Sequence, residues 1–284
     1  MQIFLAGITG NVGGAAARRL LQQGHAVRAL VRDPDKAADW ANRGVELRSG
    51  DLRDAATLAD AMAGAEAAFL LIPPIRSPKP DYADARELAA SFVAAAKQAK
   101  PKRLVTLSSV GSEKTSGLGL ITATSILERA LAELAMPVVH VRAGSFLENF
   151  VGPFKAASAS GVFETFLAPT DRTFGMIASE DIGNEVARRL TDSFAGVVEL
   201  GTQYSPDDLA RAMSEAAGRT IVARTIPRDQ WAAVLETMGL PRGGTKGFEE
   251  MDDSFNAGWI AFGVPGTEPV AGTITPVQFF KRLA

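Results

Sequence analysis

The sequence of 284 residues contains no cysteine and only two histidines, His25 and His140. Without cysteine, disulfide bonds, thiolate catalysis and cysteine-ligated metals are excluded. Two histidines are too few for a histidine-rich metal site. We therefore expect no metal in this protein.

Long apolar runs and a strong net charge are also missing. No apolar stretch approaches the ~18 residues that a membrane-spanning helix needs, and the N-terminal segment lacks the basic part, apolar part and cleavage site of a signal peptide. The formal net charge of -2 offers no general attraction to nucleic acid or anionic lipid. We expect a cytoplasmic protein with neither nucleic acid nor membrane as a partner, either a monomer or a homodimer.

What the chain does contain is an alternation of short apolar runs and alanine-rich segments of helical length. Two such segments cover Ala15 to Gln23 and Asp84 to Gln98. Continuous Val/Ile/Leu runs separated by helices indicate a parallel sheet that is covered on both faces. The pattern predicts an α/β fold with a doubly wound parallel sheet of the Rossmann type. The runs are IFLAG, VRALVR, VELRSG, AFLLIP, RLVTLSS and VVHVRAG.

This alternation loosens after Gly144. We predict a dinucleotide-binding domain over residues 1–144 and a smaller α+β cap over residues 145–284, with some later segments returning to the sheet. ASEDIGNEVARRL, SPDDLARAMSEAAG and TPVQFFKRL are typical of helices, and GVVELG is typical of a strand. An aromatic and methionine cluster is interpreted as the core of the cap, the alternative being the lining of a pocket above the sheet. Its members are Trp231, Met238, Phe248, Met251, Phe255, Trp259 and Phe262.

The segment AGITGNVGG lies between the first predicted strand and the first predicted helix, which is where a dinucleotide fingerprint belongs. Gly7 would permit the tight turn, Gly10 would let the backbone approach a pyrophosphate, and Gly13 would let the helix pack closely on the strand. The spacing is G-x-x-G-x-x-G, a departure from the strict G-x-G-x-x-G form. A simple flexible turn is the alternative. The predicted cofactor contacts of this loop are Gly7, Thr9, Gly10, Asn11, Val12 and Gly13.

Several segments in a shared order resemble the NmrA-like group of atypical short-chain dehydrogenases/reductases, which includes quinone reductases and cofactor-sensing regulators. The resemblance covers nearly the whole chain and says little about the substrate. The resembling segments are GITGNVG, LVRDPDKA, GDLRD, LLIPP, LVTLSSVG, VRAGSFLENF, SEDIG and TPVQFF.

Arg32 at the end of the second predicted strand bears on the choice of dinucleotide. An acidic residue about 20 positions after the glycines suits the ribose 2′-hydroxyl of NAD, whereas an arginine there suits the 2′-phosphate of NADP. A guanidinium grips phosphate through two N–H donors. Asp33 precedes Pro34 and is interpreted as a cap of the next helix. We therefore favour NADP(H) over NAD(H).

The ends of the third and fourth predicted strands carry further candidate cofactor residues. The resemblance implies adenine contacts for Asp51 and Leu52, although Asp51 could equally cap a turn. The backbone at Ile72, Pro73 and Pro74 is expected to pass the ribose and diphosphate of the cofactor, although the prolines could simply end the strand.

The wider superfamily uses a Tyr-x-x-x-Lys pair on the helix after the fifth strand to polarise a carbonyl, and this pair is not evident here. Matching GLGLITATSILERAL to that pattern, with Glu128 as its acidic residue, puts Leu120 at the tyrosine position and Thr124 at the lysine position. Neither side chain can do that acid–base work. The two tyrosines, Tyr82 and Tyr204, lie far from this helix in sequence. Lys114 is interpreted as a solvated surface lysine.

Candidate contacts to the nicotinamide and the acceptor lie at the ends of the fifth and sixth strands, because ligands of open parallel sheets bind at the carboxyl ends of strands. Ser108 is a candidate cofactor contact, with capping of the next turn as the alternative. Phe146 could stack on a flat substrate or be a core residue. The other candidates are Ala143, Gly144 and Ser145 for the cofactor, and Ser109, Glu148 and Asn149 for the substrate.

Several polar residues near these candidates have a structural interpretation. Glu148 has an alternative role as a cap at a helix start. His140 is expected to be packed in its strand with one nitrogen bonded, and Arg142 to be an ion-pair partner. Ser179 is expected to be the N-cap of its helix, and Asp181 to stabilise the first turn of that helix.

These residues favour a reductase that transfers hydride from NADPH to a small conjugated or aromatic acceptor, with a quinone as the best single example. Such an acceptor can take its proton from water after the hydride, so a strong protein acid is not required. The catalytic residues are not identified. A non-catalytic sensor of NADP(H) is the alternative, and a cofactor-dependent isomerase or tailoring enzyme is a third hypothesis.

Overall fold

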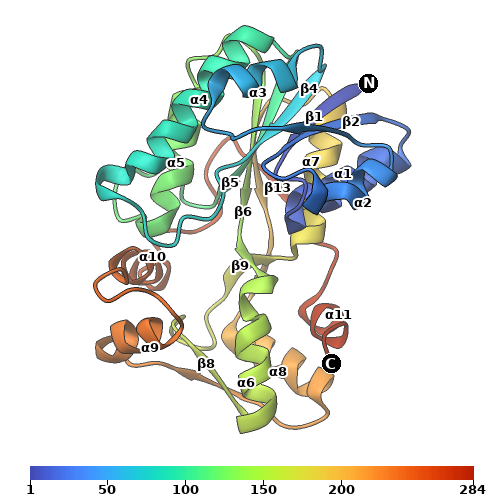
Figure 1. The fold of residues 1–284 in the computed structure, drawn as a ribbon. Helices are drawn as coiled ribbons and strands as arrows, with labels where there is room; N and C mark the ends of the chain where they lie inside the picture. Colours follow the sequence, from blue (N-terminus) through green and yellow to red (C-terminus); the bar gives the residue numbers. More distant parts are fainter.

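A computed structural model describes all 284 residues. It contains one large parallel sheet, flanked by helices on both faces, and a smaller region beyond one edge of the sheet (Figure 1). The sheet has eight strands in the order β13-β10-β6-β5-β4-β1-β2-β3. Their bounds are β1 Gln2–Ala6, β2 Ala26–Val31, β3 Glu46–Ser49, β4 Ala67–Leu70, β5 Arg103–Ser109, β6 Val138–Ala143, β10 Gly196–Leu200 and β13 Glu268–Val270.

One face of the sheet is covered by α1 (Asn11–Gln22) and α7 (Ser179–Thr191), with α2 (Ala38–Asn42) beside them. Alanines and leucines of α1 interlock with Ile182, Val186 and Leu190 of α7 over the buried valines of β5, β6 and β10. The two helices approach so closely that a Cβ on Gly183 would lie 2.4 Å from the Cβ of Ala15. Glycine is therefore needed at this contact.

The opposite face is covered by α3 (Ala55–Met62), α4 (Ala83–Ala99) and α5 (Thr122–Leu131). Their core contains Leu58, Phe92 and Leu127, all fully buried against β1 and β4. The expected doubly wound sheet is confirmed, because helices pack on both faces and every strand pair in the sheet is parallel.

The remaining elements form a cap at the carboxyl edge of the sheet, in the lower half of Figure 1. Two small sheets lie in it, with strand orders β11-β9-β7 and β12-β8. Phenylalanines such as Phe154, Phe163 and Phe280 form its core. Its elements are β7 Ser145–Phe146, α6 Val151–Ser160, β8 Val162–Thr165, β9 Phe174–Ile177, β11 Thr202–Tyr204, α8 Pro206–Ala217, β12 Val222–Thr225, α9 Trp231–Thr237, α10 Lys246–Asn256 and α11 Pro276–Lys281.

The bounds of the first helix and of the fourth strand, and the burial of the aromatic cluster, differ from the prediction. The first helix begins at Asn11, four residues earlier than Ala15, because its first turn contains the glycines that approach the β1 turn. The fourth strand ends at Leu70, before the prolines. Of the aromatic and methionine cluster expected to be core, only Trp231 is buried, whereas Met238 and Trp259 are exposed. None of the helices combines the length and the apolarity needed to cross a bilayer.

Candidate functional site

The turn after β1 has the geometry of a phosphate-binding loop. Gly7 has a φ of +68°, and the N–H of Gly10 donates to the carbonyl of Gly7 at 3.0 Å. A Cβ on Gly13 would lie 2.3 Å from the same carbonyl oxygen, so only glycine allows this approach. No side chain caps the N-terminus of α1, and no acidic residue lies in its first turn. The free N–H groups and the positive end of the helix dipole suit an anion. Thr9, Gly10 and Asn11 are exposed there, and Val12 is buried.

Arg32 follows the last residue of β2 on the same edge of the sheet. It is exposed, and no carboxylate forms an ion pair with it. Its neighbour Asp33 accepts the N–H of Asp35 at 3.2 Å and pairs with Lys36 at 3.3 Å. These contacts agree with the capping role interpreted for Asp33, and they leave the Arg32 guanidinium free for a ligand.

The segment after β4 lies beside the glycine turn, with Leu71 against Gly7, and β3 pairs with β2 one strand further along the sheet. The carboxylate of Asp51 accepts the backbone N–H of Arg53 at 2.8 Å, as the alternative role of Asp51 as a turn cap requires. The same carboxylate lies 3.7 Å from the guanidinium of Arg53. Leu52 and Ile72 are half-buried against the α3–α4 side, and Pro73 and Pro74 are exposed. Cofactor binding by these residues stays a prediction.

A buried polar cluster lies under the carboxyl ends of β5 and β6. Glu128 of α5 accepts two hydrogen bonds from Arg142, at 2.6 and 2.9 Å, and one from the hydroxyl of Ser108 at 2.5 Å. Glu113 binds Arg142 from the other side at 3.0 Å. Burial alone would lower the pKa of Arg142. The hydrogen bonds and the charge of Glu128 outweigh this effect, so the pKa of Arg142 is raised. Arg142 is thus an ion-pair partner, as interpreted from the sequence.

The positions matched to the Tyr-x-x-x-Lys pair carry no acid. Thr124 shares a hydrogen bond with the Ser112 hydroxyl at 2.7 Å, and Leu120 lies against Gly247 of α10. Tyr82 is closer in space than in sequence, because its hydroxyl donates to the carbonyl of Gly119 at 2.6 Å. This bond joins the start of α4 to the segment that leads into α5.

The corner after β6 joins the large sheet to the cap. The N–H of Gly144 donates to the carbonyl oxygen of Leu200 at 3.0 Å. A Cβ on Gly144 would lie 2.4 Å from the carbonyl oxygen of Gly175. Ser145 and Phe146 then pair with β9. Ala143 is buried, Phe146 is half-buried, and Ser109 donates to the carbonyl of its neighbour Val110.

Glu148 holds the N-terminus of α7. Its carboxylate accepts the backbone N–H of Ser179 at 3.1 Å through both oxygens and the Ser179 hydroxyl at 2.5 Å. The expectation that Ser179 is the N-cap is wrong, because Ala178 occupies that position and the capping oxygens come from Glu148. Asn149 is exposed, and its amide donates to Ser145 at 3.4 Å.

Asp181 does more than stabilise the first turn of α7. Its carboxylate accepts both the N–H and the hydroxyl of Thr273, at 2.9 and 2.5 Å, and the N–H of Ile274 at 2.9 Å. It therefore ties the chain before α11 to the sheet side. His140 is packed as expected: burial lowers its pKa, and its Nδ1 lies 2.8 Å from the Thr106 hydroxyl.

Lys114, interpreted as a solvated surface lysine, keeps 31% of its side-chain surface exposed, but it also has a partner that the sequence did not indicate. Its Nζ lies 4.4 Å from the ring centroid of Trp259, and the indole N–H of Trp259 donates to Ser116 at 3.0 Å. These two contacts connect the loop after β5 to the segment after α10. The signal missed in the sequence is a partner 145 residues away, which no local pattern indicates.

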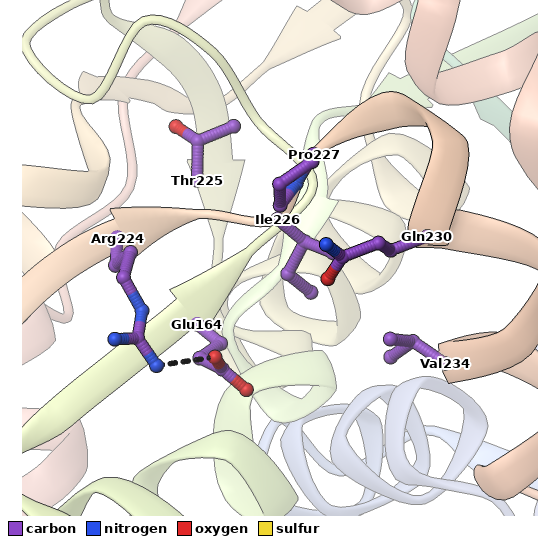
Figure 2. A pocket seen from close by; sticks show the side chains of 7 residues that line it. All are labelled: Glu164, Arg224, Thr225, Ile226, Pro227, Gln230 and Val234. Atoms are coloured by element: carbon purple, nitrogen blue, oxygen red, sulfur yellow. Dashed lines mark hydrogen bonds and ion pairs between the residues drawn. The ribbon is translucent and has the colours of Figure 1, made fainter.

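Two of the cavities in the protein are lined by residues of the cap. The larger, of about 330 Å³, lies between β8, β12 and the start of α9, where Arg224 binds Glu164 at 2.7 Å (Figure 2). None of the residues predicted to bind cofactor lines it, so we assign it no part in the site. The smaller, of about 40 Å³, is lined by Val110 after β5, by Phe174 and Gly175, and by Phe255 and Phe262. Phe255 and Phe262 line this cavity and also pack against buried residues such as Ile260, so the pocket and the core interpretations each describe them in part.

A carboxylate that the sequence reasoning missed lies on α10, one turn before Phe255. Asp252 is half-buried and takes part in no hydrogen bond or ion pair within the protein. Burial, together with the charge of Asp253, raises its pKa to about 7. In the sequence it is one of four acids between Glu249 and Asp253, and nothing local distinguishes it from the others.

The model of the NmrA-like family matches residues 1–260 of this chain. The chain belongs to the NmrA-like family. The resemblance based on the short motifs is thereby confirmed.

Relatives in this family with a described activity cover nearly the same length. The chain is 27% identical to an NAD(P)H azoreductase of Xenophilus azovorans, over 99% of this chain and 96% of that protein. It is 26% identical to quinone oxidoreductase 2 of Escherichia coli, over 85% of this chain and 83% of that protein.

Solved structures agree with the fold. The NADPH complex of the Escherichia coli quinone oxidoreductase superposes with a TM-score of 0.83 and 25% identity, covering 99% of both chains. A triphenylmethane reductase of Citrobacter reaches a TM-score of 0.82 at 22% identity, which supports the fold alone.

Proposed function

We propose that this protein is an NADPH-dependent reductase that passes hydride to a small conjugated acceptor, a quinone being the first to test. The observation that carries the proposal is the pairing of an uncapped helix N-terminus at Gly7–Gly13 with the unpaired Arg32 on the same edge of the sheet. Relatives described as an NAD(P)H azoreductase and a quinone oxidoreductase support the reaction class.

The residues at this edge fit a phosphorylated dinucleotide. The first turn of α1 would hold the diphosphate through backbone N–H groups, and Arg32 would hold a 2′-phosphate through its guanidinium. The cofactor supplies the hydride when bound. The protein's own contribution is to orient the acceptor at the carboxyl ends of β5 and β6 and to exclude water there. The Glu128–Arg142 pair ties α5 to β6 beside these strand ends.

The test is NADPH oxidation by the purified protein across a panel of quinones, followed by absorbance. We expect acceptor-dependent oxidation that is lost in Gly13→Ala, because the new Cβ would displace the turn that holds the diphosphate. Gly152→Ala serves as the matched control, since nothing lies within 4 Å of a Cβ at that position. Absence of turnover with every quinone, despite NADPH binding, would refute a quinone reductase.

That result would favour the second candidate, a sensor of NADP(H). The observation in its favour is that neither tyrosine precedes a lysine by four residues, since Arg86 follows Tyr82 and Asp208 follows Tyr204 at that spacing. A sensor needs a response to the cofactor and no acid. Different affinities for NADPH and NADP⁺, together with altered binding to a partner protein, would identify it.

A further inference from the structure

The chain between α10 and β13 crosses the carboxyl edge of the large sheet. Its residues, 257–267, form neither helix nor strand. Early in this segment, Ile260 is buried against the turn that follows β5. Further on, the carboxylate of Glu199 on β10 accepts two successive backbone N–H groups, the first being that of Gly263 at 2.7 Å. The segment is therefore fixed on both sides of Phe262.

The ring of Phe262 lies directly on the backbone of two glycines. A Cβ on Gly175 would lie 2.1 Å from the ring carbon Cε2, and a Cβ on Gly201 would lie 2.9 Å from the same atom. Neither glycine has a positive φ, so the backbone conformation alone would admit other residues at both positions. What glycine provides here is room for a flat ring against the backbone. We call the place between these two glycines and the segment above them the ring slot.

The ring slot lies at the carboxyl ends of β6 and β10. Gly201 directly follows β10, and the carbonyl oxygen of Gly175 would lie 2.4 Å from a Cβ on Gly144, which directly follows β6. The N–H of Gly144 also donates to Leu200, the last residue of β10, at 3.0 Å. Ligands of open parallel sheets bind at this edge. A ring in the slot therefore lies next to a residue predicted to meet the nicotinamide.

The space beside the slot does not admit a second ring. The smaller cavity adjoins the Phe262 ring and is also lined by Val110, Phe174 and Phe255. Its volume of about 40 Å³ has room for a water but not for an aromatic ring. The one charged side chain in its lining, Arg172, already donates to a backbone carbonyl at the end of α10. An uncharged acceptor ring and the ring of Phe262 would thus compete for one place.

The side chain of Phe262 can leave the slot while the backbone stays where it is. Phe262 is half-buried, and its neighbours Ala261 and Gly263 are exposed. The contacts of Ile260 and Glu199 hold the backbone on either side. A change of χ1 from one staggered well to another moves the ring toward solvent. For a partly exposed side chain, such a change is fast compared with catalytic turnover.

We propose that Phe262 is a gate residue: its ring fills the ring slot in the free protein, and a flat, uncharged acceptor ring takes its place. This inference deepens the proposed reductase function and rests on it. The acceptor binds only to those molecules in which the Phe262 ring is turned out, so its apparent affinity is reduced by that fraction. The slot selects planar acceptors, because a planar group is what it holds in the free protein.

The first measurement needs neither cofactor nor turnover. Phenylalanine rings are labelled with ¹³C, and the Phe262 resonances are assigned as those missing from Phe262→Leu. In the free protein we expect nuclear Overhauser contacts between the Phe262 ring and the Hα protons of Gly201. Added hydroquinone, the product expected from a quinone, should replace them with contacts of its own to Gly201. Persistence of the Phe262 contacts at saturating hydroquinone, or no contact between hydroquinone and Gly201, would overturn the proposal.

The second measurement is the KM for 1,4-benzoquinone. Phe262→Ala should lower KM about tenfold with little change in kcat, because the acceptor no longer has to displace a ring. Phe262→Leu should lower KM less, and Phe262→Trp should raise it. Phe166→Ala is the matched control, since Phe166 is another half-buried phenylalanine of the cap, with its ring centroid 5.4 Å from that of Trp231. It should leave KM as in the parent protein.

An equal or higher KM in Phe262→Ala would mean that the ring supports the acceptor and does not occupy its place, which would refute the gate. The reductase function would then still stand on the turnover of the parent protein. Displacement of the Phe262 ring by hydroquinone without turnover of any quinone would have the opposite meaning. It would support the slot as a binding site for rings and refute the reductase, so the two failures are distinguishable.

Discussion

The contact between α1 and α7 and the packing of α10 differ in how completely their side chains are buried. At the first, small residues let two helices and a sheet pack until no space remains, with Gly183 against Ala15. At the second, no residue is fully buried, and Asp252 forms no hydrogen bond or ion pair within the protein. The packed contact stabilises the fold, whereas the environment that raises the pKa of Asp252 costs stability at neutral pH. Four predictions test this contrast.

The largest effect is expected where packing is tightest. Gly183→Ala should lower the free energy of unfolding by about 3 kcal/mol, because overpacking displaces both helices. Urea unfolding followed by circular dichroism measures it. Gly152→Ala on α6 of the cap is the counterpart, and with nothing within 4 Å of its Cβ it should stabilise by up to about 0.5 kcal/mol. Equal effects of the two substitutions would show that the contrast in packing is not real.

The sequence predicted the packed region well. The runs RLVTLSS and VVHVRAG correspond to β5 (Arg103–Ser109) and β6 (Val138–Ala143), because buried parallel strands must be continuously apolar. The glycine turn was also predicted, since its chemistry is local. The prediction was worse for the start of α1, because glycines inside a helix give the same signal as a turn.

The surroundings of α10 could not be predicted in the same way. The smaller cavity is lined by the segments after β5 and before β9 and by α10, and their relation depends on tertiary packing. The aromatic cluster was assigned to a core because an amphipathic pattern records which side is apolar and not whether that side is covered. Nor could the sequence show that Glu148 caps α7 from 31 residues away, since such a contact has no local signature.

Cofactor choice is the second prediction, and it concerns the sheet region alone. Arg32→Ala should weaken NADPH binding by about tenfold to 100-fold, which corresponds to losing hydrogen bonds to a charged group. NADH binding should change little, because NADH has no 2′-phosphate. Isothermal titration with each cofactor measures both. Arg211→Ala, at an exposed arginine of the cap, is the control, and a variant that keeps its preference for NADPH would exclude Arg32 as the phosphate ligand.

The third prediction concerns the stability cost of the Asp252 carboxylate on α10. The pKa of Asp252 is raised by folding from 3.8 to about 7, so the folded state holds the proton more strongly than the unfolded chain. Stability therefore falls as the pH rises between these values. Asp252→Asn should not share this fall, and should be more stable than the parent protein above neutral pH by about 1–2 kcal/mol. Near pH 4 the two proteins should match within error.

Thermal unfolding at several pH values measures this difference. Asp253→Asn, which removes a carboxylate bound to Arg228, should be less stable than the parent protein above neutral pH. A destabilised Asp252→Asn at high pH would mean that this carboxylate has a partner in solution, and the contrast with the packed region would then fail at its central residue.

The smallest effect is expected at the contact between Lys114 and Trp259, which connects the loop after β5 to the segment after α10. Lys114→Met removes the charge over the Trp259 ring, and Trp259→Leu removes the ring. A double-mutant cycle of these two substitutions should give a coupling free energy of about 0.5 kcal/mol, because both side chains are partly exposed to water. Urea unfolding of the four proteins measures the cycle. Since Trp259 lies three residues after the end of α10, a coupling near zero would mean that the other contacts of α10, among them the approach of Gly119 to Gly247 and the ion pairs of Arg228, hold it without help from this pair.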